Sequence, residues 1–169
     1  MRAAHRLFGA VGIAVALGAC AHDQATPAGA GPGPFPCPYG AANDGTQSYD
    51  LLCREPVANQ VKVKHILVGW KELSSPDHPR DPRADGRTYA EAQALARDLL
   101  HRLREGAPIE PLMGEYSEDP GSAHSGQAYD ASPSAALVSE FKSLSLRLAP
   151  GEAGIVKSAF GLHVIQRVP

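Results

Sequence analysis

Apolar and polar positions between residues 57 and 169 follow the periods of a strand and of a helix. Residues 61–68 are rich in β-branched residues, alternate in part and contain no Gly or Pro, which predicts a strand. Residues 88–103 carry apolar side chains three and four positions apart, which predicts an amphipathic helix. Thr88 and Glu91 have the spacing of a capping box, so we expect this helix to begin there.

Shorter apolar runs predict the remaining elements of the domain. Residues 109–116 and 137–148 indicate two more helices, and residues 154–157 and 161–168 indicate two strands. The Pro-rich stretch 72–87 indicates a polar loop. The order strand, three helices, two strands is typical of an α+β domain. We expect its first and last strands to lie side by side at the centre of a small antiparallel or mixed sheet flanked by helices.

The first 19 residues have the pattern of a secretory signal peptide. Arg2 and Arg6 precede an uncharged apolar run, 7–17, that is too short to cross a bilayer about 30 Å thick as a helix. Small residues then lead to Cys20, as in a bacterial lipobox, so we expect lipidation of Cys20. The alternative is an ordinary signal peptide with a cysteine there by chance. The prediction is a lipid-anchored protein of the bacterial cell envelope, at the outer membrane and facing the periplasm.

Residues 20–56 are predicted to form a tether between the anchor and the domain. Nine of the fourteen residues from 27 to 40 are Gly or Pro, and such a segment buries too little apolar surface to offset its ordering entropy. Cys37 and Cys53 lie in this tether, and the oxidising conditions met by an exported chain favour a disulfide between them. A metal site is the alternative, but the two cysteines lack CxxC spacing and a histidine at ligand spacing.

Composition narrows the classes of function. The 16 basic and 18 acidic side chains give a formal net charge of -2, so nothing here favours nucleic-acid binding. Aromatic residues make up only 6% of the chain, which argues against a large aromatic-lined cofactor cavity. The loop at 72–87 interleaves basic with acidic residues, so a solvated loop is a better interpretation than a phosphate site.

Five segments of the domain share residues with one known family. They run from Lys64 to Val68, from Arg87 to Ala92, from Tyr116 to Ala123 (a Tyr-Ser-x-Asp-x-x-Ser-Ala pattern), from Phe141 to Glu152 and from Ala159 to Ile165. Through their order and spacing, residues 61–168 resemble a parvulin-type peptidyl-prolyl cis/trans isomerase. The resemblance implies a parvulin-like, FKBP-like fold. It also implies an enzyme that rotates X–Pro peptide bonds and needs no metal or cofactor.

The resemblance implies a polar centre made of His65, Asp119, His163 and Ser158. An X–Pro bond rotates slowly because rotation breaks amide resonance, so the site has to bind the twisted amide better than either planar form. We expect these four side chains to act through positioning and electrostatics. The alternative for the histidines is a structural role within the sheet, and the alternative for Asp119 is ordinary turn chemistry.

The resemblance also implies an apolar slot for the proline ring. Its walls would be Leu137, Val138 and Phe141, with Phe160 and Tyr129 closing it. Leu137 and Phe141 are four residues apart, which would place them on one face of a helix. The alternative to a role in the slot is that these side chains simply pack in the core, and this applies above all to Val138.

One segment departs from the family and leaves two functions open. Residues 126–130 stand where most relatives have Gly-Gly-Asp-Leu-Gly, and the lost glycines remove backbone conformations with positive φ. The first prediction is an isomerase that binds proline-containing segments of unfolded exported proteins and assists their folding, which proline isomerisation slows to tens of seconds. The alternatives are a catalytically weak or inactive parvulin-like chaperone lipoprotein that binds peptides, and a structural envelope lipoprotein.

Overall fold

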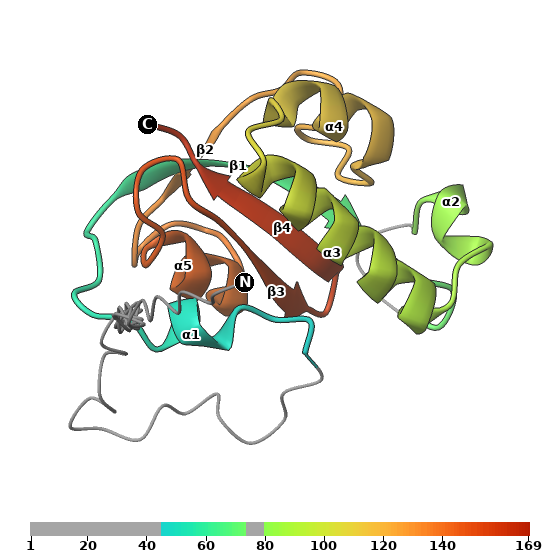
Figure 1. The fold of residues 1–169 in the computed structure, drawn as a ribbon, viewed down its shortest axis with the longest axis horizontal. Helices are drawn as coiled ribbons and strands as arrows, with labels where there is room; N and C mark the ends of the chain where they lie inside the picture. Colours follow the sequence, from blue (N-terminus) through green and yellow to red (C-terminus); the bar gives the residue numbers. More distant parts are fainter. Residues whose placement is uncertain (1–44, 74–79) are drawn as a thin grey trace, which may run out of the picture. The chain divides into compact units, whose positions relative to one another are not determined.

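The computed structural model describes residues 45–73 and 80–169. The predicted signal peptide, Cys20 and most of the predicted tether, including Cys37, lie outside the described residues. The described elements, in chain order, are α1 (Tyr49–Leu52), β1 (Val61–Val68), α2 (Pro82–Asp85), α3 (Tyr89–Arg104), α4 (Ile109–Tyr116), β2 (Tyr129–Ala131), α5 (Ser139–Ser145), β3 (Ala153–Ser158) and β4 (Gly161–Arg167) (Figure 1).

The four strands form one antiparallel sheet in the order β2-β1-β4-β3. β1 and β4 pair along the middle of the sheet, from Val63 opposite Arg167 to Val68 opposite Leu162. The prediction that the first and last strands lie side by side is therefore confirmed. β2 was not predicted, because its three residues are too few to show an alternating pattern.

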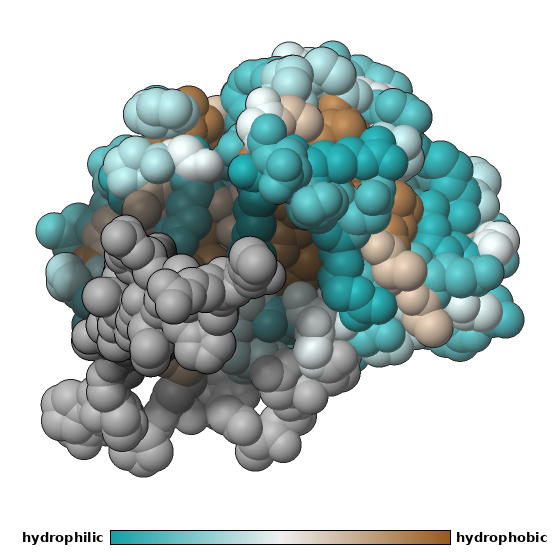
Figure 2. Space-filling model, in the orientation of Figure 1, coloured by the Kyte–Doolittle hydropathy of each residue, from teal (hydrophilic) through white to brown (hydrophobic). Residues whose placement is uncertain are grey.

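Two groups of helices cover the two faces of the sheet. α3 and α4 bury side chains such as Leu99 and Met113 against Ile66 and its neighbours on one face. α1 and α5 pack on the other face, where Leu144 contacts the cluster around Ile165. Figure 1 shows α3 lying along β4, and the outward surface over α3 is mostly hydrophilic (Figure 2). Successive residues of a strand point to opposite faces, so each strand supplies both layers of the core.

The start of α3 has the predicted capping box. The Glu91 backbone N–H donates to the Thr88 hydroxyl, and the Glu91 carboxylate accepts from the Thr88 backbone N–H at 2.7 Å. Both side chains satisfy backbone donors that the first turn of a helix leaves unpaired. The prediction for this helix is confirmed at its start.

The folded domain begins before residue 57, where the sequence pattern had placed its start. We call residues 46–52 the edge strap, because they lie against the outer edge of β3. The Ser48 backbone N–H donates to the Ile155 carbonyl at 2.8 Å, and the Ile155 N–H donates to the Ser48 hydroxyl at 3.0 Å. Leu51 is 2% exposed, and a side chain at Gly154 would come within 2.8 Å of it. The tether boundary at 56 was wrong because a four-residue helix leaves no periodic pattern.

Three further details differ from the predicted elements or add to them. α2 forms a short helix inside the expected loop, and α5 begins at Ser139 rather than at residue 137. Cys53 is disulfide-bonded, and its partner lies outside the described residues. The pairing of Cys53 with Cys37 therefore stays a prediction.

Candidate active site on the central strands

The two central strands bring the predicted histidines together. Leu67 of β1 lies opposite His163 of β4, so His65, two residues earlier on the same face, is the diagonal neighbour of His163. Their Nδ1 atoms are 3.3 Å apart, and their rings stack at 24° with centroids 5.4 Å apart. Both side chains are buried on the face that carries α5, at 4% and 5% exposure. The sheet register alone accounts for this pair.

Asp119 lies in the loop after α4 and receives four hydrogen bonds on one oxygen. His65 Nε2 lies 3.2 Å from Asp119 Oδ2, and the Tyr129 hydroxyl donates to it at 2.8 Å. Ser122 donates twice, from its backbone N–H at 3.0 Å and from its hydroxyl at 2.6 Å. Burial raises the pKa of the Asp119 carboxyl, but the bonds from His65, Ser122 and Tyr129 outweigh it and hold this pKa well below its ordinary value. Asp119 is therefore an ionised carboxylate at neutral pH.

A buried ion pair fixes the Asp119 loop to the end of β1. The Glu118 backbone N–H donates to the Leu67 carbonyl at 2.9 Å, continuing the edge of the strand. The Glu118 carboxylate, 3% exposed, accepts from the Gly69 N–H at 2.7 Å and from Arg87 at 2.6 Å. Because the next residue is Asp119, these contacts set its distance from His65.

The hydrogen bonds from Asp119 to Ser158 form one continuous chain. An ionised carboxylate only accepts, so the proton in the His65–Asp119 bond belongs to His65 Nε2. His163 is neutral, so one of its two ring nitrogens donates a hydrogen bond and the other accepts one. His163 Nδ1 lies 3.3 Å from His65 Nδ1, and His163 Nε2 lies 2.7 Å from the Ser158 hydroxyl, which accepts from the Phe160 N–H at 3.0 Å.

Burial keeps the inner histidine of this chain neutral. Desolvation, and then the neighbouring His65, lower the pKa of His163 from 6.5 to about 3. Burial, and then the bond to Asp119, raise the pKa of Tyr129 to about 12, so its hydroxyl stays a donor. Around neutral pH His163 is therefore neutral and Tyr129 keeps its proton.

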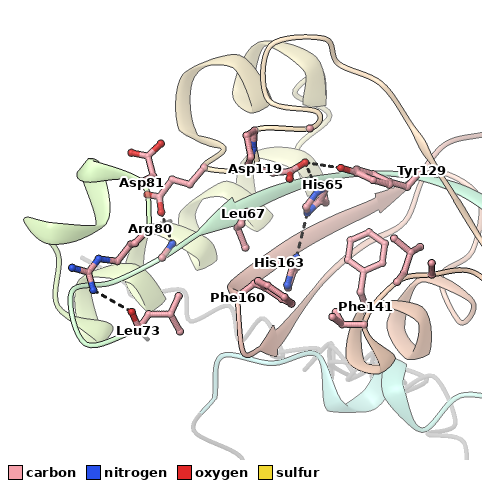
Figure 3. Close-up of a pocket in the computed structure, with 17 residues that line it drawn as sticks. His65, Leu67, Leu73, Arg80, Asp81, Asp119, Tyr129, Phe141, Phe160 and His163 are labelled. Carbon is pink, nitrogen blue, oxygen red and sulfur yellow. Dashed lines mark hydrogen bonds and ion pairs between the residues drawn. The ribbon is translucent and has the colours of Figure 1, made fainter. Parts of the chain in front are cut away.

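An apolar cavity of about 500 Å³ opens beside this chain (Figure 3). The Phe141 ring, 3% exposed, meets both imidazoles edge-on, at centroid distances of 5.1 and 5.4 Å. All five residues predicted for the proline slot line the cavity: Tyr129, Leu137, Val138, Phe141 and Phe160. His65, Asp119 and His163 line it too, while Ser158 reaches it only through His163.

The structure corrects the predicted placement of Leu137 on the same helix as Phe141. Leu137 and Val138 precede α5, and Val138 is its N-cap, so the helical spacing proposed for Leu137 and Phe141 is wrong. The two residues meet the cavity from the turn before the helix instead. Sequence reasoning also missed Ser122 as a donor to Asp119, although Ser122 belongs to the Tyr-Ser-x-Asp-x-x-Ser-Ala pattern that marked the loop.

Two features are absent from the part of the chain that the structure describes. Within 45–73 and 80–169, no cluster of three or more His, Cys, Asp or Glu side chains has the arrangement of a metal site. In the same ranges, no helix combines the length and the hydrophobicity needed to cross a membrane.

The family model for PPIC-type PPIase domains matches residues 49–168. The chain belongs to the PPIC-type peptidyl-prolyl isomerase family, also called parvulins. The match begins at Tyr49, in the edge strap, which agrees with the earlier start of the folded domain. The family predicted from the five sequence segments is confirmed.

Curated relatives of this parvulin domain are longer proteins. The chain is 32% identical to the Chaperone SurA of Pseudomonas aeruginosa over 111 residues, which are 65% of this chain and 24% of that protein. It is 29% identical to the Foldase protein PrsA 4 of Bacillus cereus over 125 residues, which are 73% of this chain and 45% of that protein. The chain thus spans about a quarter to less than half the length of these relatives.

Solved structures share the parvulin fold. The solution structure of TbPIN1 superposes with a TM-score of 0.56 at 24% identity, covering 66% of this chain and 98% of that one. The peptidyl-prolyl isomerase ESS1 from Candida albicans gives a TM-score of 0.54 at 24% identity and covers 66% and 63% of the two chains. The predicted α+β fold class is confirmed, and the sheet is antiparallel throughout.

Proposed function

We propose that this PPIC-type domain catalyses cis/trans isomerisation of X–Pro bonds in unfolded exported proteins and so assists their folding. The observation that carries the proposal is the chain from Asp119 to Ser158, lying along one wall of an apolar cavity of about 500 Å³. A pyrrolidine ring is small and apolar, and it fits among Leu137, Phe141 and Phe160. The foldase and chaperone names of the relatives support a role in protein folding.

The cavity favours the twisted amide in two ways. A planar X–Pro amide has the larger dipole because resonance places negative charge on its oxygen, so removing water from it raises the energy of the planar form more than that of the twisted form. The Asp119 carboxylate adds to this effect where it faces the carbonyl oxygen, since twisting reduces the charge on that oxygen. No bond to a heavy atom forms or breaks, so no nucleophile is needed.

The histidine pair holds the carboxylate and the ring wall in place. His65 donates to Asp119, and Phe141 packs edge-on against both imidazoles. In this mechanism the charge of Asp119 acts on the amide, and His65, His163 and Ser158 keep it oriented. Ser158 is thus a positioning residue, three hydrogen bonds away from the carboxylate.

A protease-coupled assay on Ala-Xaa-Pro-Phe peptides tests this proposal. We expect turnover above the uncatalysed rate, and we expect Asp119→Asn and Phe141→Ala to lower kcat/KM about 10-fold or more. Leu112→Ala is the matched control, because it removes a buried apolar side chain from the face of the sheet opposite the cavity. A rate at background for every peptide, with the domain folded by circular dichroism, would refute the proposed activity.

Binding without turnover is the second candidate function. Residues 126–130 depart from the family pattern, and here Tyr129 places a hydroxyl on Asp119 within the cavity. A peptide-binding chaperone would bind unfolded clients with the affinity of the wild type and still give no rate in the assay above. A measured rate that depends on Asp119 excludes this candidate.

The proposal includes a lipid anchor at Cys20, after a signal peptide spanning residues 1–19. Its support is the sequence alone: a basic start, an uncharged apolar run and small residues before Cys20. Labelling with a fatty acid in a bacterial host should mark the full chain and its Cys37→Ala variant but not Cys20→Ala. A label that persists in Cys20→Ala, or that is missing from the wild type, would contradict the anchor. Fractionation of inner and outer membranes tests the predicted outer-membrane address.

A further inference from the structure

The charges around the cavity cancel in pairs, with one exception. Three carboxylates of the described residues line it, those of Asp81, Glu118 and Asp119. Arg83 donates to both oxygens of Asp81, at 3.0 and 2.9 Å, and Arg87 pairs with Glu118. Asp119 is therefore the one carboxylate among the described lining residues that has no Arg or Lys partner, because its donors are His65, Ser122 and Tyr129.

Arg80, which lines the cavity, does not neutralise the charge of the Asp119 carboxylate. Arg80 directs its guanidinium away to Asp85 and donates to the backbone carbonyls of Lys71 and Leu73, at 2.6 and 3.1 Å. The sequence from residue 69 to residue 87 holds four basic and four acidic side chains, so this loop adds no net charge. Since Arg87 pairs with Glu118 and Arg80 pairs with Asp85, the charge of Asp119 stays uncompensated by any described Arg or Lys.

Asp119 also keeps one oxygen available to a ligand. All four hydrogen bonds from Ser122, Tyr129 and His65 go to Oδ2, and no described residue donates to Oδ1. Oδ1 of the ionised carboxylate is a second acceptor, and a hydrogen bond that it accepts from a cation is shorter and stronger than one from a neutral donor. Asp119 is partly buried, with its side chain 17% exposed, so salt screens it less than a carboxylate on the open surface.

We propose that this site selects X–Pro segments in which the residue before proline is Arg or Lys, and that Asp119 is the residue that selects them. The inference rests on the proposed function, because it assumes that the proline ring occupies the slot around Phe141. The bond that rotates joins the preceding residue to the proline nitrogen, so the polar centre beside the slot faces that residue. A cationic side chain there reaches Asp119 Oδ1, while an acidic or phosphorylated one is repelled by the same charge.

The test compares peptides that differ only before proline. For Ala-Xaa-Pro-Phe peptides with Xaa as Arg, Leu or Glu, we expect kcat/KM to fall in that order, by about 3-fold at each step at low salt. Raising the salt concentration should remove most of the advantage of Arg and leave the Leu peptide unchanged, because only charge interactions are screened. Equal rates for Arg and Glu, or faster turnover of Glu, would overturn the inference.

Two variants separate the charge of Asp119 from its other roles. Asp119→Asn lowers every rate, so the readout is the ratio of Arg to Glu peptides, which we expect to fall to about 1. Glu115→Gln removes one negative charge from an exposed position on α4, outside the cavity, and should keep the wild-type ratio. A ratio that survives in Asp119→Asn, or that disappears in Glu115→Gln, would overturn the assignment to Asp119.

Equilibrium binding distinguishes this inference from the proposed activity. Fluorescence polarisation of the same labelled peptides gives affinities that do not depend on turnover. Tighter binding of Arg than of Glu peptides without any turnover supports the inference and refutes the isomerase activity. Turnover without a charge preference refutes the inference and leaves the activity standing, and no detectable binding of any peptide refutes both.

Discussion

The buried histidine predicts a loss of stability in mild acid. In the folded protein the pKa of His163 is about 3, and in the unfolded chain it returns to about 6.5. Between these values the unfolded state binds a proton that the folded state does not. The free energy of unfolding therefore falls as pH falls below about 6.5, by about 1.4 kcal/mol per pH unit.

The shift in the pKa of His163 sets how much the free energy of unfolding changes over an experimentally accessible pH range. From about pH 7.5 to about pH 4.5, His163 alone lowers the free energy of unfolding by about 2.5 kcal/mol. Asp119 contributes little to the change in the free energy of unfolding over this pH range. Its pKa is lowered on folding, so the stability it contributes is lost only as pH falls below the ordinary value of 3.8. The pKa values of Glu91, Glu110 and Glu152 are also lowered in the folded protein, so these groups contribute at the acid end of this range, and a comparison with a variant that lacks the imidazole isolates the effect of His163.

Urea denaturation across this pH range measures the effect. Trp70 is the single tryptophan of the chain, is 7% exposed and packs on Tyr89, so its fluorescence reports unfolding. His163→Gln removes the titrating ring and should lose about 2.5 kcal/mol less than the wild type between the two pH values. His101→Gln, at an exposed position on α3, is the control and should behave as the wild type does. A difference below about 1 kcal/mol between wild type and His163→Gln would refute the reasoning.

Three further substitutions test the scaffold around the site. Arg87→Met leaves Glu118 as an unpaired buried charge and should lower the free energy of unfolding in urea by about 3 kcal/mol, most of which Glu118→Gln in the same chain should restore. Leu51→Ala in the edge strap should cost about 3 kcal/mol, and a cost near zero would show that the strap does not belong to the folded core. Gly161→Ala places a methyl group 2.8 Å from the Val68 carbonyl at a φ of +146°, so we expect a lower melting temperature by calorimetry.

Local patterns along the chain determined most of the elements. The β-branched run at residues 61–68 and the capping box at Thr88 each carry their signal within a few residues, and the structure has both elements where they were predicted. The family pattern around Asp119 predicted the loop that supplies the carboxylate. Such signals survive without tertiary contacts because they depend on backbone preferences and on nearest neighbours along the chain.

Elements without such a pattern appeared only in the tertiary structure. The edge strap and β2 are too short to be periodic, and each is held by pairing with a strand that is distant in the sequence. The position of Leu137 before α5, rather than on it, depends likewise on the packing of a short helix against the sheet.

The chemistry of the site was decided by distances between chain segments. The register of β1 on β4 sets the imidazoles 3.3 Å apart, and the Arg87–Glu118 pair places Asp119 within reach of His65. Asp119 accepts all its bonds on one oxygen and has no Arg or Lys partner among the described residues because of the way three separate segments meet around it. The sequence by itself identified all the participants except Ser122. Their hydrogen-bond order and the uncompensated charge arose only when folding brought these segments together, because electrostatic interactions depend on distance in space and not on separation along the chain.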